Sequence, residues 1–249
     1  MISALLTAFQ TLTRIRAPSP RRAPDAAVLG ASAIFYPFVG AVIGVAGFGL
    51  YRLLSDVLPR DIIMLGVLAL WVLLTGALHE DGLADTCDAF GSQSRPDQIL
   101  RVMKDSAIGT YGAVGLVLTL LLRWRTLAAI GPEYTLPACL LSQVLPRTGI
   151  VALAFWAGPA TSGSGGSFAA GLRLPHVIGS VALGGVVLMP LMADWMLILC
   201  AAGVCVVGIV LLGLYFRRRL GGVTGDCLGT AVQFQELGVL MMVLIWTTR

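Results

Sequence analysis

The chain has 249 residues, of which 57% are apolar and only 12% are Asp, Glu, Lys or Arg. Because average soluble domains carry about 25% charged residues, this composition excludes a soluble enzyme. The apolar residues suffice for about seven membrane spans of ~20 residues each, which leaves no room for a sizeable soluble domain. We therefore expect one integral membrane domain over residues 1–249, with an all-α fold: a polytopic transmembrane helical bundle.

The net charge of +4 comes from basic residues that are scattered between apolar runs. A nucleic-acid-binding protein would gather them on one stretch, so the basic balance indicates membrane topology and no nucleic-acid partner is expected. The five cysteines form no Cys-x-x-Cys pair. Neither a disulfide framework nor a zinc site is therefore indicated.

The apolar pattern predicts the elements in chain order. Residues 1–15 place apolar side chains at helical spacing among Ser, Thr and Gln, which predicts an interfacial helix instead of a span. The seven predicted spans cover about residues 28–51, 61–78, 107–129, 136–158, 177–193, 195–216 and 228–246. The Gly- and Ser-rich residues 158–171 predict a flexible loop, either a lid or a linker.

Lys and Arg are shared unequally between alternate ends of these spans, and the richer side is expected to be cytoplasmic. With the N-terminus inside, 11 basic residues are internal: Arg14, Arg16, Arg21, Arg22, Arg95, Arg101, Lys104, Arg173, Arg217, Arg218 and Arg219. Five are external: Arg52, Arg60, Arg123, Arg125 and Arg249. The bias predicts a cytoplasmic N-terminus and an external C-terminus.

Six of the 13 acidic residues lie between positions 79 and 105. Three of them, Asp81, Asp85 and Asp88, follow the second predicted span at i, i+4 and i+7, so a helical continuation of that span would place them on one face. Carboxylates without thiolates suit a hard divalent ion, and Mg²⁺ shared with phosphate oxygens is the usual case. These three aspartates are therefore the predicted metal ligands.

Other polar residues leave two interpretations open. The loop from Gly221 to Asp226 is either a plain turn or a place where backbone N–H groups approach a phosphate. His79 beside the acidic cluster is either a general base or a hydrogen-bonding residue at a helix end. Arg147 and Glu236 lie in apolar runs and should face the bundle interior, where they are either functional or paired with each other.

The string from His79 to Asp88, HEDGLADTCD, resembles the cobalamin 5'-phosphate synthase family, also called adenosylcobinamide-GDP ribazoletransferase. The segments 103–106 (MKDS), 109–112 (GTYG), 12–15 (LTRI) and 222–229 (GVTGDCLG) are similar to the family's pattern too, so the resemblance spans almost the whole chain. Two departures are small. Arg16 stands where proline is common, and Cys87 stands where a small residue is common.

The resemblance implies a Mg²⁺-dependent phosphotransferase of the bacterial inner membrane, with its active site facing the cytoplasm. A hydroxyl of α-ribazole, or of its 5'-phosphate, would displace GMP from adenosylcobinamide-GDP and give adenosylcobalamin or its 5'-phosphate. Asp81, Asp85 and Asp88 would bind the metal, and His79 and Asp105 would be catalytic. The implied substrate-binding residues are Arg101, Lys104, Arg147, Thr224, Gly225 and Asp226. The sequence specifies neither the acceptor nor the oligomeric state.

Two alternatives come from other classes. A CDP-alcohol phosphotransferase also gathers aspartates on membrane helices, but its motif needs Ala-Arg where this chain has Asp85-Thr86, and a glycine where Arg95 stands. A cation-coupled transporter would favour acids near the membrane midplane, such as Glu236, over a cluster at one boundary. Both alternatives therefore fit the sequence less well.

Overall fold

The computed structural model describes residues 1–15 and 25–248, so Arg16, Arg21, Arg22 and Arg249 lie outside it. Within the described residues the regular structure is helical, apart from one isolated bridge between Pro159 and Val223. The helices are α1 (Ile2–Leu12), α2 (Ala26–Ser32), α3 (Tyr36–Leu54), α4 (Arg60–Thr75), α5 (Leu78–Ser92), α6 (Pro96–Val102), α7 (Thr110–Ala129), α8 (Thr135–Ala157), α9 (Ser164–Gly171), α10 (Leu174–Val187), α11 (Trp195–Leu220) and α12 (Gly225–Thr247). Short 3₁₀ turns are η1 (Ala33–Phe35), η2 (Pro132–Tyr134) and η3 (Met189–Asp194).

The helical bundle agrees with the predicted fold class. In the described ranges, five continuous helical stretches are long and apolar enough to cross a bilayer: Ala26–Leu54, Thr110–Ala129, Pro132–Ala157, Met189–Leu220 and Gly225–Thr247. Two bent pairs, α4 with α5 and α9 with α10, raise the number to seven. Each predicted span coincides with one of these segments. We treat α3, α4, α7, α8, α10, α11 and α12 as the spans, with α5 and α9 outside them.

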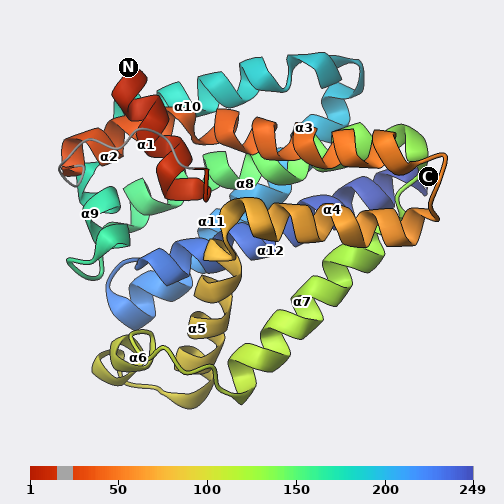
Figure 1. Ribbon diagram of the computed structural model, residues 1–249. Helices are drawn as coiled ribbons and strands as arrows, with labels where there is room; N and C mark the ends of the chain where they lie inside the picture. The colour runs from red at the N-terminus through yellow and green to blue at the C-terminus, as the bar shows by residue number, and fades with distance from the viewer. Residues whose placement is uncertain (16–24, 249) are drawn as a thin grey trace.

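The connections between spans lie at two opposite ends of the bundle (Figure 1). The α3–α4, α7–α8 and α10–α11 connections lie at the end where the chain terminates. Helices α1, α2, α5, α6 and α9 lie at the other end, together with the α11–α12 turn, and we call this the N-terminal end. The predicted N-terminal helix is α1, which packs against α2 and α3. Most of the polar segments therefore share one end of the bundle.

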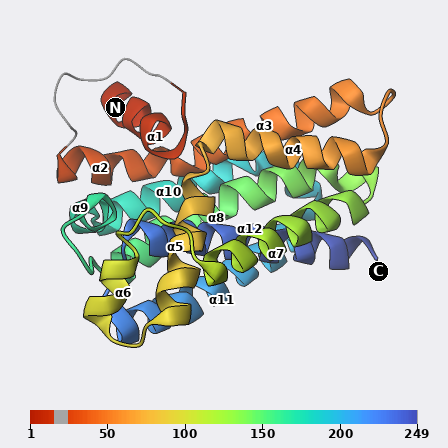
Figure 2. The same cartoon turned by 60° about the horizontal axis from the view of Figure 1, so that its bottom comes forward.

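The second span does not continue straight into the acidic segment, so the predicted continuous helix is wrong. The backbone turns at Gly76 (φ 66°) and Ala77 (φ 59°), both in the left-handed region, and α5 leaves α4 at 88°. Gly76 suits this turn because a Cβ there would meet the Arg14 side chain at 2.3 Å. Figures 1 and 2 show α5 running steeply across the direction of α4, with α6 at its far end.

The Gly- and Ser-rich segment was predicted to be a flexible loop, but residues 164–171 form α9. The segment before α9 is tied to the α11–α12 turn by backbone hydrogen bonds from Ala160 N to Val223 O (3.0 Å) and from Val223 N to Gly158 O (2.9 Å). Gly165 permits a close approach, because a Cβ there would lie 2.2 Å from Gly225 N. The start of α9 is therefore fastened to the start of α12.

A buried group of charged side chains joins four helices inside the bundle. Arg123 Nη1 on α7 donates to Glu80 Oε1 (3.2 Å) on α5 and to Gln233 Oε1 (2.6 Å) on α12. Its Nη2 donates to Glu236, and Glu236 Oε1 also accepts from Arg147 Nη1 on α8 (3.0 Å). All five side chains are buried. This confirms that Arg147 and Glu236 face the interior and shows that they pair with each other.

The position of Arg123 corrects the topology count. From the sequence, Arg123 was counted as external, although the predicted span 107–129 contains it. In the structure Arg123 lies within α7 and points into the bundle, where two carboxylates pair with it. The external count of five basic residues therefore falls to four, and the predicted bias becomes stronger.

Arg123→Gln is expected to lower the free energy of unfolding by about 3–5 kcal/mol, because it leaves Glu80 and Glu236 buried with a cation removed. Thermal unfolding of the purified protein in detergent measures this loss. The matched control is Arg125→Gln on the same helix, since Arg125 is exposed and its replacement should change stability by less than about 0.5 kcal/mol. Equal midpoints for the two variants would contradict the structural role of the buried group.

Candidate active site

A cavity of about 340 Å³ lies at the N-terminal end, where α1, α2, α3, α5, α8, α9 and α12 meet. Its polar lining consists mainly of His79 and Asp81 from α5 and Asp226 from α12. A second hollow of about 420 Å³ adjoins it and shares Asp81. Arg14 lines this second hollow, and sequence reasoning had used that residue only for topology. The position of Arg14 in the family-like segment 12–15 was the one signal in the sequence that pointed to a place at the site.

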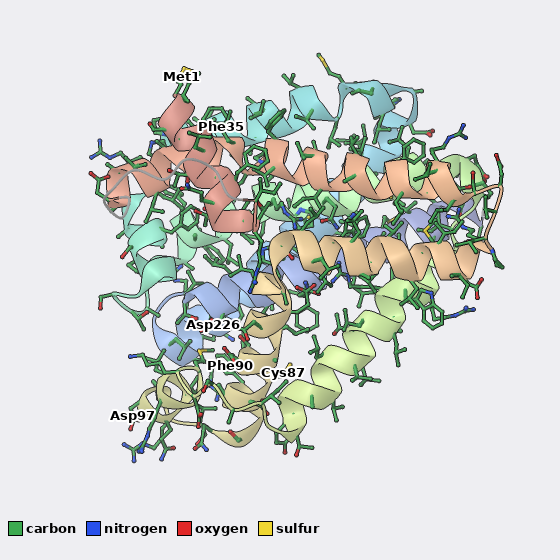
Figure 3. All side chains as sticks on the ribbon, viewed as in Figure 1. Met1, Phe35, Cys87, Phe90, Asp97 and Asp226 are labelled. Atoms are coloured by element: carbon green, nitrogen blue, oxygen red, sulfur yellow. The ribbon has the colours of Figure 1, made fainter. Side chains whose placement is uncertain are left out.

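Two glycines bring α5 and α12 together. A Cβ on Gly82 would lie 3.0 Å from Asp226 Cα, and a Cβ on Gly229 would lie 3.4 Å from the backbone of both Gly82 and His79. Thr230 Oγ1 donates to Gly82 O across the same contact (2.9 Å). Small residues allow membrane helices to approach this closely. Figure 3 shows Asp226 at the start of α12, beside α5.

His79 is buried in the first turn of α5 and lines the cavity. Its Nε2 has no hydrogen-bond partner within the protein. A buried ring nitrogen without a partner loses its hydration and gains nothing in return. His79 is therefore available to a hydroxyl or phosphate group that enters the cavity, and its role as a general base stays a prediction.

Asp81, Asp85 and Asp226 form a group of carboxylates from two helices. Asp81 is exposed, whereas Asp85 and Asp226 are partly buried. Burial, followed by repulsion from the charges of Asp81, Asp226 and Asp88, raises the pKa of Asp85 to about 6. A cation would relieve this repulsion. Across the described parts of the chain, however, no three His, Cys, Asp or Glu side chains are already grouped tightly enough to hold a metal ion.

Asp88, the third predicted metal ligand, has a second use that the sequence did not reveal. Its Oδ2 accepts from Gly109 N (2.7 Å) and its Oδ1 from Gly112 N (2.9 Å), so it caps the start of α7. A Cβ on Gly112 would lie 2.2 Å from Asp88 Oδ2, which explains the glycine. Asp88 thereby fixes α5 to α7. Its role as a metal ligand stays a prediction.

Of the three predicted substrate-binding residues at the start of α12, two reach the cavity. Gly225 and Asp226 line it. Thr224 instead caps α12, since its Oγ1 accepts from Cys227 N (3.2 Å) and lies 3.4 Å from Asp226 Oδ2. Thr224 therefore positions the first turn of α12, where Asp226 lies.

The structure does not bring the remaining predicted residues to the cavity. Arg101 on α6 and Lys104 and Asp105 after it are exposed, and Asp105 Oδ1 accepts from Ala107 N (3.1 Å) within a local turn. Arg147 is held by Glu236 and by Gln143 O (3.0 Å) inside the bundle. The catalytic role of Asp105 and the substrate-binding roles of the three basic residues stay predictions from the sequence.

Comparison with known proteins agrees with the resemblance. The family model for cobalamin-5-phosphate synthase matches residues 4–244. Adenosylcobinamide-GDP ribazoletransferase of Ralstonia pickettii (strain 12J) is 36% identical, over 98% of this chain and 95% of the relative. The protein of the same name from Geotalea daltonii (strain DSM 22248 / JCM 15807 / FRC-32) is 34% identical, over 97% of this chain and 96% of the relative. No solved structure matches.

The match extends over nearly the whole chain and includes the two segments that contribute His79, Asp81 and Asp226 to the cavity, His79–Asp88 and Gly222–Gly229. It favours a transferase of cobalamin biosynthesis over the CDP-alcohol phosphotransferase and transporter alternatives. The chain belongs to the cobalamin-5-phosphate synthase family.

Proposed function

We propose that this protein transfers the phosphocobinamide group of adenosylcobinamide-GDP to α-ribazole or its 5'-phosphate. The products are GMP and adenosylcobalamin or its 5'-phosphate. One observation carries the proposal: the two family-like segments, from opposite halves of the chain, line one cavity through His79, Asp81 and Asp226. Relatives named adenosylcobinamide-GDP ribazoletransferase match over most of the chain and support it.

The reaction forms one P–O bond and breaks another. A ribazole hydroxyl attacks the phosphorus on the cobinamide side of the diphosphate, the bond to the bridging oxygen breaks, and GMP leaves with that oxygen. The hydroxyl proton needs an acceptor. Buried His79 lines the cavity and its Nε2 has no partner within the protein, which suits it to that task.

Asp81, Asp85 and Asp226 fit a divalent cation by their chemistry, because hard oxygen donors of like charge converge there from two helices. Mg²⁺, when bound, neutralises charge on the phosphoryl oxygens. From the sequence, Asp226 was assigned to substrate binding. We propose it instead as a Mg²⁺ ligand, because its charge acts on both Asp81 and Asp85. Asp88 orients α5 through its cap on α7.

We propose that the cavity faces the cytoplasm of a bacterial inner membrane. The described internal basic residues all lie on segments at the N-terminal end, including Arg14, Lys104, Arg173 and Arg217–Arg219. Nucleotide substrates are kept on that side of the membrane. Entry from the cytoplasm therefore requires no transport step.

The purified protein in detergent should release GMP from adenosylcobinamide-GDP only when α-ribazole or its 5'-phosphate and Mg²⁺ are present. His79→Asn should lower kcat by about 100- to 10,000-fold, the usual contribution of a general base, with little change in stability. Chromatography of the nucleotide and corrinoid products measures GMP release and kcat. The absence of GMP release from folded wild-type protein with either acceptor would contradict the proposed function.

The aspartates should separate into two classes. Asp81→Asn, Asp85→Asn and Asp226→Asn should each raise the Mg²⁺ concentration needed for half-maximal turnover by at least about tenfold and leave thermal stability near wild type. Asp88→Asn should instead destabilise by about 1 kcal/mol, because it weakens the cap on α7. Turnover titrated with Mg²⁺ and thermal unfolding without metal give the two readouts. Unchanged Mg²⁺ dependence in the first three variants would contradict the proposal that these aspartates bind Mg²⁺.

Orientation can be tested with a cysteine at exposed Ser92, at the end of α5, in a background without native cysteines. We expect it to resist impermeant thiol reagents in intact cells and to react in inverted vesicles. The control is a cysteine at exposed Asp56, in the α3–α4 connection at the opposite end, which should show the reverse pattern. Labelling of residue 92 from outside would overturn the orientation.

A further inference from the structure

The cavity has an apolar part that the reaction chemistry does not explain. Beyond His79 and the carboxylates, its walls include Leu12 of α1, Tyr36 of α3, Ile150 of α8 and Phe168 of α9. These four side chains are buried, yet they border open space. The rings of Tyr36 and Phe168 stack with centroids 5.2 Å apart and planes 5° apart. We call these four residues the apolar wall.

The wall and His79 together define the ligand that would fit. Aromatic and aliphatic walls with a few placed polar groups are typical of sites for small aromatic ligands. His79 Nε2 is buried and unpartnered at the same cavity, so the ligand must also carry a hydrogen-bonding group. A lipid acyl chain would cover the wall but leave His79 without a partner. An amphipathic ligand with a flat apolar part therefore fits best.

We propose that the apolar wall binds the aromatic base of the acceptor nucleoside and so selects which base is accepted. This inference rests on the proposed function. The base of α-ribazole is a dimethylbenzimidazole, a flat bicycle with apolar edges. Guanine has polar edges that this wall cannot satisfy, and a corrin ring is far larger than a cavity of about 340 Å³.

This placement also orients the reacting group. With the base against Tyr36 and Phe168, the attached ribose extends toward His79, Asp81 and Asp226, which line the same cavity. The ribose hydroxyl then meets His79, and the donor diphosphate approaches from the side of exposed Asp81. Phe168 is well placed to set base selectivity, because its helix α9 is held to α12 by the close contact of Gly165 with Gly225.

The test measures α-ribazole binding, without metal or donor, by calorimetry. Phe168→Leu should weaken binding about 3- to 10-fold, the loss expected for one aromatic contact. Ile150→Phe should fill part of the cavity and weaken binding of dimethylbenzimidazole riboside more than binding of the unsubstituted benzimidazole riboside. The control is Phe216→Leu, which alters an equally buried phenylalanine on α11 away from the cavity and should bind like wild type.

Steady-state kinetics provides the second readout. It tests the proposal even if ribazole binds only after the donor and calorimetry without donor detects no binding. KM for ribazole should rise in Phe168→Leu and Ile150→Phe, while KM for adenosylcobinamide-GDP stays within about twofold of wild type. If both folded variants bind ribazole with wild-type affinity and wild-type KM, the proposal is overturned. A rise in the KM for adenosylcobinamide-GDP alone would overturn it as well. Wild-type protein that releases no GMP with any acceptor would instead refute the proposed function.

Discussion

Helices α5 and α12 meet with their backbones in contact at Gly82 and Gly229, and the site depends on that contact. Any side chain at Gly82 would press against the Asp226 backbone, and Asp226 would move away from the aspartates of α5. The hydrogen bond from Thr230 to Gly82 O secures the same contact. Because α5 leaves α4 at 88°, the α5–α12 contact positions the acidic cluster over the end of the bundle.

Buried charges stabilise the same pair of helices from the interior. Glu80 stands between His79 and Asp81 in sequence, yet it points away from the cavity to Arg123 and Gln233. Two cations and two carboxylates balance each other there, which lets charged groups lie inside a membrane protein. One turn of α5 thus presents His79 and Asp81 to the cavity on one face and Glu80 to the buried charged group on another.

Local patterns predicted much of this arrangement. Apolar runs located the five long apolar stretches and the two bent pairs, and the spacing of Asp81, Asp85 and Asp88 placed them on one helix. The turn at Gly76 and Ala77 was not predictable, because alanine rarely adopts a positive φ and the packing of Arg14 against Gly76 is a tertiary contact. From the sequence, Arg123 was counted with the external basic residues because its partners Glu80 and Glu236 are remote in sequence. The approach of Asp226 to Asp85 is likewise a tertiary contact.

The convergence of α5 and α12 can be measured directly by cross-linking. Cysteines replace Asp81 and Asp226, which line the same cavity, in a chain without native cysteines, and a short bifunctional thiol reagent is added. We expect efficient linkage of the α5 and α12 peptides by mass spectrometry, and little linkage when the first cysteine replaces Asp97, an exposed residue of α6 that does not line the cavity. Absence of the α5–α12 link, or equal linkage from residue 97, would contradict a site built from these two helices.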